Sequence, residues 1–160
     1  MCKKITFFSI IIAWLIFSCQ TVMAEDRFTD NGNGTLTDHK LELMWAKADN
    51  QGDINWKHAN AWAKYTFGDT ISPRYNNWRL PTLEELKSLY VTDSKYKGYM
   101  TDCGFMVKIV PEIKLSCILL WTSEESTGAH VAFNCNIGNS FAIPAYDVNG
   151  CRGLPVRSLK

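Results

Sequence analysis

The sequence predicts one small α+β domain that is exported from the cytoplasm. Three observations carry this prediction: a charged and then apolar start, strand patterns at both ends of the remaining chain with helical patterns between them, and four cysteines in that remainder. A chain of 160 residues suits a single hydrophobic core. A hydrophobic content of 46% with 21% charged residues is typical of globular proteins and not of disordered ones.

Residues 1–24 have the features of a signal peptide. Lys3 and Lys4 precede an uncharged, mostly apolar run over residues 5–17, and a cleavage site at 22–24 follows. The apolar run is shorter than the roughly 20 residues of a membrane span. Cleavage there leaves residues 25–160 as the folded domain.

A second interpretation of the same region is a lipoprotein signal. Residues 16–19 are similar to a lipoprotein box, in which Cys19 would carry the lipid and anchor the domain to a membrane. Both interpretations place the domain outside the cytoplasm, in the periplasm, on the cell surface or in the medium. Only lipidation at Cys19 implies a membrane partner.

The charge balance argues against nucleic acid as a partner. The formal net charge is +1, and loss of Lys3 and Lys4 with the signal makes it −1. General binders of nucleic acids or other polyanions carry a clear excess of lysine and arginine. We therefore expect no nucleic-acid partner.

The cysteines of the domain predict two disulfides, because their number is even and the chain is exported. They are Cys103, Cys117, Cys135 and Cys151. Three pairings are possible. We favour Cys103–Cys117 and Cys135–Cys151, because each closes a short loop, and closing about 15 residues is worth roughly 3 kcal/mol in the loop-entropy model. No two lie two to four residues apart, as zinc knuckles require, so these cysteines are not expected to form a metal site.

The first half of the domain is predicted to form a hairpin, a strand and a helix. Two Asn-Gly pairs within residues 27–38 predict tight turns, and the apolar segment 41–46 predicts a buried strand. A helix is predicted over residues 55–65, because Trp56, Ala59, Ala63 and Phe67 share one helical face. Gly68 is the predicted stop.

A second helix is predicted after Trp78-Arg79-Leu80-Pro81-Thr82, since Thr82 and Glu85 form a capping box. Its predicted inward face holds Leu83, Leu86 and Tyr90. Arg79 could bind an anion at the start of this helix. The favoured interpretation is that Arg79 pairs with Glu84 or Glu85 and braces the loop.

The last third is predicted to form strands at 118–122, 130–134, 140–145 and 156–159. Residues 93–115 show no clear helix or strand pattern. We expect two helices packed on a small, mostly antiparallel sheet in a loop-rich domain, with the first and last strands in one sheet. Four tryptophans fall within the apolar patterns and are predicted to lie in the core, and Trp62 is the one expected to be exposed. These four are Trp45, Trp56, Trp78 and Trp121.

The order of these motifs resembles the Lcl C-terminal domain family of bacteria. The matching segments are Phe28-Thr29-Asp30-Asn31-Gly32, Gly34-Thr35, Thr37-Asp38, Leu43-Met44-Trp45-Ala46, Trp56 with Ala59, residues 78–82 with Glu85-Leu86, Trp121-Thr122-Ser123 and Val156-Arg157. The resemblance implies a C-type-lectin-like fold and an exported or surface domain that recognises a glycan or protein ligand, for example in adhesion. The Glu-Pro-Asn and Trp-Asn-Asp segments of calcium-dependent sugar binders do not occur in the sequence, so calcium-mediated sugar binding is not expected.

Residues 95–99 are the candidate ligand-binding segment. Lys95, Tyr96, Lys97 and Tyr99 interleave charge and aromatic surface, although such a segment is more often a solvated loop whose tyrosines cover the core. By analogy with the fold, a binding face would draw on loops 92–116, 124–129 and 138–150.

An enzyme is not expected, because no catalytic or cofactor motif is visible. The histidines His39, His58 and His130 lack metal-ligand spacing, and Ser123 lacks the context of a nucleophile. Two rival functions remain. One is an enzyme on a scaffold like that of the formylglycine-generating enzymes, which the Arg-Leu-Pro-Thr segment also resembles. The other is a structural envelope protein without a small ligand.

Overall fold

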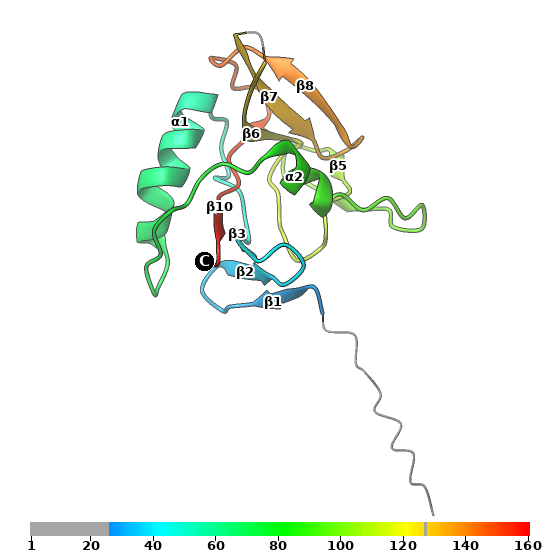
Figure 1. Cartoon of the computed structure of the whole chain (residues 1–160). Coiled ribbons are helices and arrows are strands. Elements are labelled where there is room, and N and C mark those ends of the chain that lie inside the picture. Colours follow the sequence, from blue (N-terminus) through cyan, green and yellow to red (C-terminus); the bar gives the residue numbers. More distant parts are fainter. Residues whose placement is uncertain (1–25, 127) are drawn as a thin grey trace, which may run out of the picture.

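The computed structural model describes residues 26–126 and 128–160 (Figure 1). The predicted signal, 1–24, and the alternative lipidation site Cys19 lie outside these residues. The elements in chain order are β1 (Phe28–Asp30), β2 (Thr35–Asp38), β3 (Leu43–Ala46), α1 (Trp56–Ala61), α2 (Leu83–Leu89), β4 (Tyr99–Met100), β5 (Met106–Val107), β6 (Leu119–Ser126), β7 (Ala129–Asn134), β8 (Asn139–Ile143), β9 (Cys151–Arg152) and β10 (Val156–Ser158). The predicted α+β class is confirmed.

One sheet joins the beginning and the end of the domain. Its strand order is β1-β2-β3-β10, and all three pairings are antiparallel. The hairpin predicted at 27–38 is present as β1 and β2. Gly32 and Gly34 in its turn have φ values of 72° and 85°, the left-handed region that glycine adopts at little cost. The sheet contains the first and last strands of the domain, as the sequence predicted.

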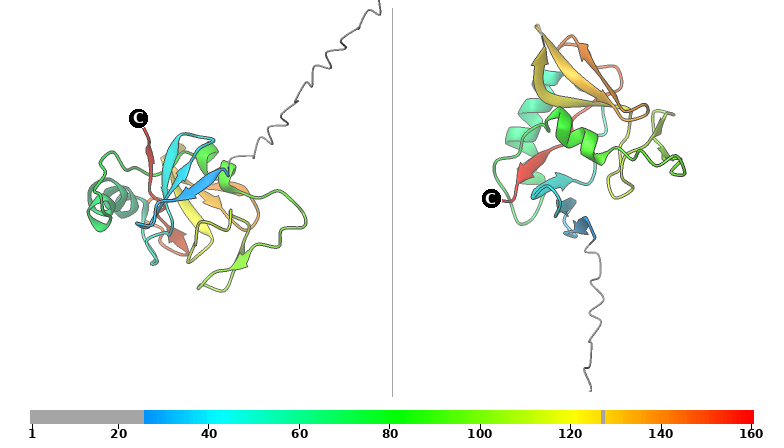
Figure 2. Two further views of the ribbon diagram at one scale, coloured as in Figure 1. Left: turned by 90° about the horizontal axis from the view of Figure 1, so that it is seen from below. Right: turned by 45° about the vertical axis from the view of Figure 1, so that its right-hand side comes forward.

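The second sheet has the order β8-β7-β6-β9 and lies between the two helices. Leu120 and Phe133 point to the face that α2 covers. Trp121 and Ala132, one residue along each strand, point to the face that α1 covers. Figure 2 shows the helices on either side of this sheet. β8 is its exposed edge strand, and β9 pairs with β6 in parallel.

The first helix starts where predicted and runs further than predicted. Asn55 caps α1 by accepting a hydrogen bond from a backbone amide. The chain continues as a π-helical turn, Trp62–Thr66, and a 3-10 turn, Phe67–Thr70, so Gly68 does not end the helical segment. Glycine is required at 68 for another reason, because a Cβ there would lie 2.6 Å from the backbone oxygen of Tyr75.

Three of the four predicted core tryptophans are almost wholly buried, namely Trp45, Trp78 and Trp121. Trp56 is only half-buried and stacks on His130 at a centroid distance of 3.7 Å. Trp62 was predicted to be exposed and is half-buried, packed edge-on against Phe67 at 5.5 Å. The extra turns after α1 bring Phe67 over this ring, which a straight helix ending at 65 would not do.

One predicted disulfide is present and the other is not. Cys103 and Cys117 are bonded, with their Cα atoms 5.3 Å apart, as predicted. Cys135 and Cys151 are free and buried, so the prediction of a Cys135–Cys151 bond was wrong.

Sheet topology explains why these two thiols cannot meet. Cys135 follows β7 and Cys151 begins β9, and β6 lies between those two strands. Two strand spacings separate their backbones by roughly 10 Å, whereas a disulfide requires Cα atoms within about 7 Å. The two side chains also join different core clusters, on opposite faces of the sheet.

Candidate ligand-binding site

The motif at 78–85 is a structural brace. Two nitrogens of Arg79 donate to the two carboxylate oxygens of Glu85, at 2.8 and 2.7 Å. Glu85 also accepts from the Thr82 amide at 2.8 Å, and the Thr82 hydroxyl accepts from the Glu85 amide, which completes the capping box. Glu84 pairs instead with Lys87. The favoured interpretation of Arg79 is confirmed, and its guanidinium is occupied.

The electrostatics of the brace follow from this geometry. The hydrogen bonds to Glu85 raise the pKa of Arg79. Burial by itself would raise the pKa of Glu85, but the hydrogen bonds from Arg79 and Thr82 outweigh burial and hold that pKa below its ordinary value.

The rest of the motif links the second helix to both sheets. Trp78 and Leu80 are buried, and the carbonyl of Pro81 accepts from the amide of Ser123 at 2.8 Å. The carboxylate of Glu124 accepts from the amide of Leu83 at the start of α2, also at 2.8 Å. The motif therefore positions α2 against β6.

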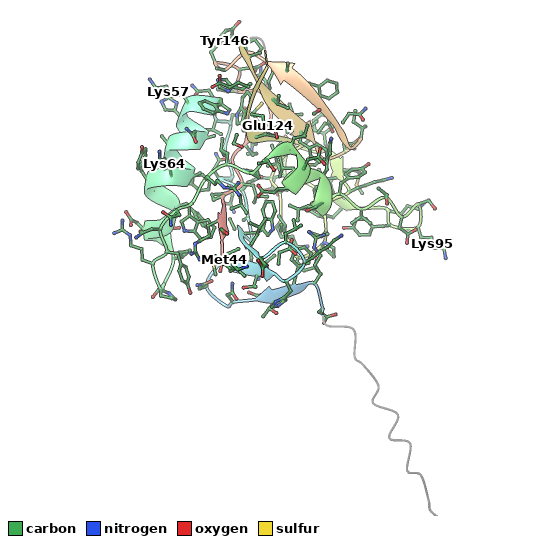
Figure 3. All side chains as sticks on the ribbon, in the orientation of Figure 1. Met44, Lys57, Lys64, Lys95, Glu124 and Tyr146 are labelled. Atoms are coloured by element: carbon green, nitrogen blue, oxygen red, sulfur yellow. A yellow bond between two sulfur atoms is a disulfide. The ribbon has the colours of Figure 1, made fainter. Side chains whose placement is uncertain are left out.

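The four candidate ligand residues do not form one site. They lie on and beside a loop that projects from the body of the domain, and Figure 3 shows Lys95 at its tip. Lys95 and Lys97 are exposed, whereas the hydroxyl of Tyr96 donates to the backbone oxygen of Ile109 at 2.9 Å. Tyr96 thus fixes the loop over the core, as the solvated-loop interpretation predicted.

Tyr99 is the member of this set that lines a cavity. Its hydroxyl donates to the Ile113 oxygen at 2.7 Å and accepts from the Leu115 amide at 3.0 Å. Burial raises the pKa of Tyr99, so the phenol stays protonated and can serve as this donor.

The cavity has a volume of about 180 Å³. Its lining residues are Gln51, Tyr99, Met100, Asp102, Lys114, Leu115 and Ser116. Six of the seven come from the loop 92–116 that the sequence indicated, and no described residue of the loops 124–129 and 138–150 lines the cavity. Gln51 was missed. Gln51 reaches the cavity because Ala48 and Lys114 form a parallel β-bridge. A bridge between two such distant residues leaves no local signal in the sequence.

A buried polar network supports the cavity floor. Ser116 donates to the Asp49 carboxylate through its amide at 2.7 Å and through its hydroxyl at 2.8 Å. The Gln51 amide donates to the same carboxylate at 2.8 Å. Arg152 donates to the Ser116 hydroxyl at 2.7 Å and pairs with Asp53. Because Asp49 and Arg152 are both satisfied, the floor is preorganised.

The disulfide fixes both walls of the cavity. Cys103 directly follows Asp102, and Cys117 directly follows Ser116. The Cys103 amide also donates to the Ser116 carbonyl at 3.0 Å. A covalent bond and a hydrogen bond therefore join the two segments that supply most of the lining.

The rim of the cavity carries two opposite charges. Asp102 and Lys114 are exposed, and neither forms an ion pair within residues 26–126 and 128–160. The Lys114 ammonium lies 4.8 Å from the centre of the Tyr99 ring. The cavity thus combines separated charges with a rigid floor.

The free thiols are poor nucleophiles. Burial raises the pKa of Cys135 well above its ordinary value and raises that of Cys151 to about 12. The reactive species is the thiolate, which neither residue forms near neutral pH. In the part of the chain that the structure covers, no three or more His, Cys, Asp or Glu side chains group as metal ligands. That same part holds no helix with the length and apolarity of a membrane span.

Fold and site together define a small, disulfide-bonded α+β domain with a cavity built on its loops. The chain belongs to the Lcl C-terminal domain family, whose family model matches residues 34–157. The matched segment contains both helices, the disulfide and every residue of the cavity. Among curated proteins, none shows a significant sequence match.

Proposed function

We propose that this domain is an extracytoplasmic binding module that recognises a glycan or protein ligand at the bacterial surface, for example in adhesion, and that the cavity beside Tyr99 is its binding site. The observation that carries the proposal is the cavity itself, in which Asp102 and Lys114 place opposite charges, without an ion pair to any described residue, over a preorganised floor. Binding sites are typically concave and hold a few fixed polar groups, as this one does.

The proposed location and fold have support of their own. The Cys103–Cys117 disulfide favours an oxidising compartment, in agreement with an export signal at 1–24 or a lipid anchor at Cys19. Terminal strands that share a sheet and a cavity built on long loops are in keeping with a C-type-lectin-like fold. The intact mass of the exported protein distinguishes simple cleavage from lipidation.

Binding is favoured over catalysis. An enzyme built on a formylglycine-type scaffold would need a reactive thiol, and the described free thiols, Cys135 and Cys151, are buried with raised pKa values. A structural protein without a ligand would leave the cavity unused.

The test compares ligand binding by the exported, processed protein with binding by two double variants. The cavity variant combines Asp102→Asn with Lys114→Gln. The control combines Glu84→Gln with Lys64→Gln, which removes the same two charges from exposed positions on the outer faces of α2 and the turn after α1. Each protein is applied to a glycan array and to immobilised bacterial surface proteins.

We expect the native protein and the control to bind the same ligand, and the cavity variant to bind it at least tenfold more weakly. Absence of any ligand on either surface would count against a binding module. Equal binding by all three proteins would show that the binding site lies elsewhere on the domain.

A further inference from the structure

We infer that the cavity recognises a zwitterionic unit, one compact group that carries an ammonium and a carboxylate together, as a free α-amino acid does. This inference rests on the proposed function and narrows its ligand to a surface molecule that displays such a unit. It follows from the size of the cavity, from its charges and from what covers its aromatic ring.

Size limits the ligand to a single small unit. A cavity of about 150 Å³ in another protein holds one benzene molecule, whereas pockets for drug-sized molecules measure about 300–1,000 Å³. The present cavity, at about 180 Å³, suits one amino acid or one sugar ring.

The rim charges select a ligand that has both signs. A carboxylate drawn to Lys114 is repelled by Asp102 within the same small cavity, and an ammonium meets the reverse arrangement. A neutral ligand would displace water from both charged side chains without giving either of them a charged partner. A zwitterion places its carboxylate at Lys114 and its ammonium at Asp102, so that both interactions are favourable.

The groups behind the floor give the cavity a slight negative bias. Asp49 accepts from the floor residue Ser116, Arg152 donates to Ser116 and pairs with the partly exposed Asp53, and the rim adds one charge of each sign. Three carboxylates and two cations therefore line the cavity or adjoin its floor. Of two ligands with a single charge, the cation should bind better than the anion, and the zwitterion should bind better than both.

The covering of Tyr99 argues against a sugar ring. Sugars commonly stack their C–H face on an open aromatic ring, but the Lys114 ammonium lies over the Tyr99 ring at 4.8 Å and backbone groups hold its hydroxyl. No tryptophan is among the lining residues. Met100 is 62% exposed at the rim and offers a flexible apolar contact, which suits an amino-acid side chain.

The experiment is an NMR titration of the isotope-labelled, exported protein with four probes. L-methionine carries both charges, L-methioninamide only the ammonium, N-acetyl-L-methionine only the carboxylate, and glucose neither. We expect L-methionine to shift the amides of residues 99–102 and 114–116. Methioninamide should bind at least tenfold more weakly, N-acetylmethionine more weakly still, and glucose should not bind.

Single variants assign each charge. In Asp102→Asn the advantage of L-methionine over its N-acetyl derivative should disappear, because the partner of the ammonium is gone. In Lys114→Gln its advantage over methioninamide should disappear. Lys64→Gln, the control, should leave the ranking unchanged.

The outcomes separate this inference from the proposed function. Shifts of the cavity amides by glucose and not by L-methionine would overturn the inference and leave a sugar-binding module. No shift by any probe would also overturn the inference, while the array experiment would still decide whether the cavity binds a larger ligand. The wild-type titration alone is decisive if a variant fails to fold.

Discussion

Arg79 and Glu85 are joined by two parallel hydrogen bonds, and the same carboxylate accepts the backbone amide at the start of α2. The Glu85 side chain thus fixes the end of the loop before α2, contributes to the N-terminal cap of α2 and neutralises the guanidinium of Arg79. Since Arg79 also exchanges backbone hydrogen bonds with Val156 in β10, the brace connects α2 to the sheet that contains the first and last strands of the domain.

Loss of this carboxylate should destabilise the fold. Glu85→Ala removes three hydrogen bonds, and we expect a loss of about 1–2 kcal/mol in the free energy of unfolding, modest because Arg79 is partly exposed. Glu84→Ala is the matched control, since its pair with Lys87 lies on the exposed face and is worth at most about 0.5 kcal/mol. Urea denaturation followed by tryptophan fluorescence measures both. Equal losses in the two variants would contradict a bracing role.

The same pair predicts a specific dependence on pH. The pKa of Glu85 is lower in the folded state than in the unfolded chain, where it is about 4.3. Its contribution is therefore complete above that value and is lost as the pH falls through the folded pKa. We expect the stability difference between the native protein and Glu85→Gln to be largest at pH 6–7 and to shrink below about pH 4. Urea midpoints at several pH values test this, and a difference that stayed constant down to pH 3 would be the contrary result.

Local patterns in the sequence were sufficient for the brace and the hairpin. The capping box links residues three positions apart, and the Asn-Gly turn needs only its own residues, so short segments determine both. The loop that forms the cavity was also indicated, through the charged and aromatic residues around Tyr99.

Pairings between distant segments could not be read in the same way. Gln51 joins the cavity through a parallel bridge between residues 48 and 114, and β9 is two residues long and pairs in parallel with β6. The second disulfide was predicted from short loop closure. The closure argument contains no information on the strand that separates Cys135 from Cys151.

Counting reactive thiols tests this corrected cysteine assignment. In the processed protein we expect iodoacetamide at neutral pH to modify no cysteine in the folded state, because Cys135 and Cys151 are buried and protonated. Denaturation without a reductant should expose two thiols, and reduction should add two more from Cys103 and Cys117. Mass spectrometry of the alkylated protein counts them. An absence of alkylation in the unreduced, denatured protein would restore the second disulfide.

β4 and β5 pair in antiparallel as a small hairpin that carries Tyr99 and Met100, and Gly98 and Gly104 are a matched pair of positions beside its strands. Both glycines have positive φ, 78° and 82°, so substitution by alanine at either position lowers the free energy of unfolding by about 1–2 kcal/mol, because alanine is strained in a left-handed conformation. At Gly104 a Cβ meets nothing within 4 Å, whereas at Gly98 it would lie 2.0 Å from the backbone oxygen of Val107. We therefore expect Gly98→Ala to cost about 1–3 kcal/mol more than Gly104→Ala, because β4 and β5 must move apart. Urea denaturation measures the difference, and similar losses would show that the strands of the hairpin separate easily. Since Tyr99 directly follows Gly98, the same displacement should broaden or shift the amide signals of residues 99–102, while Gly104→Ala should change the Tyr99 signal little.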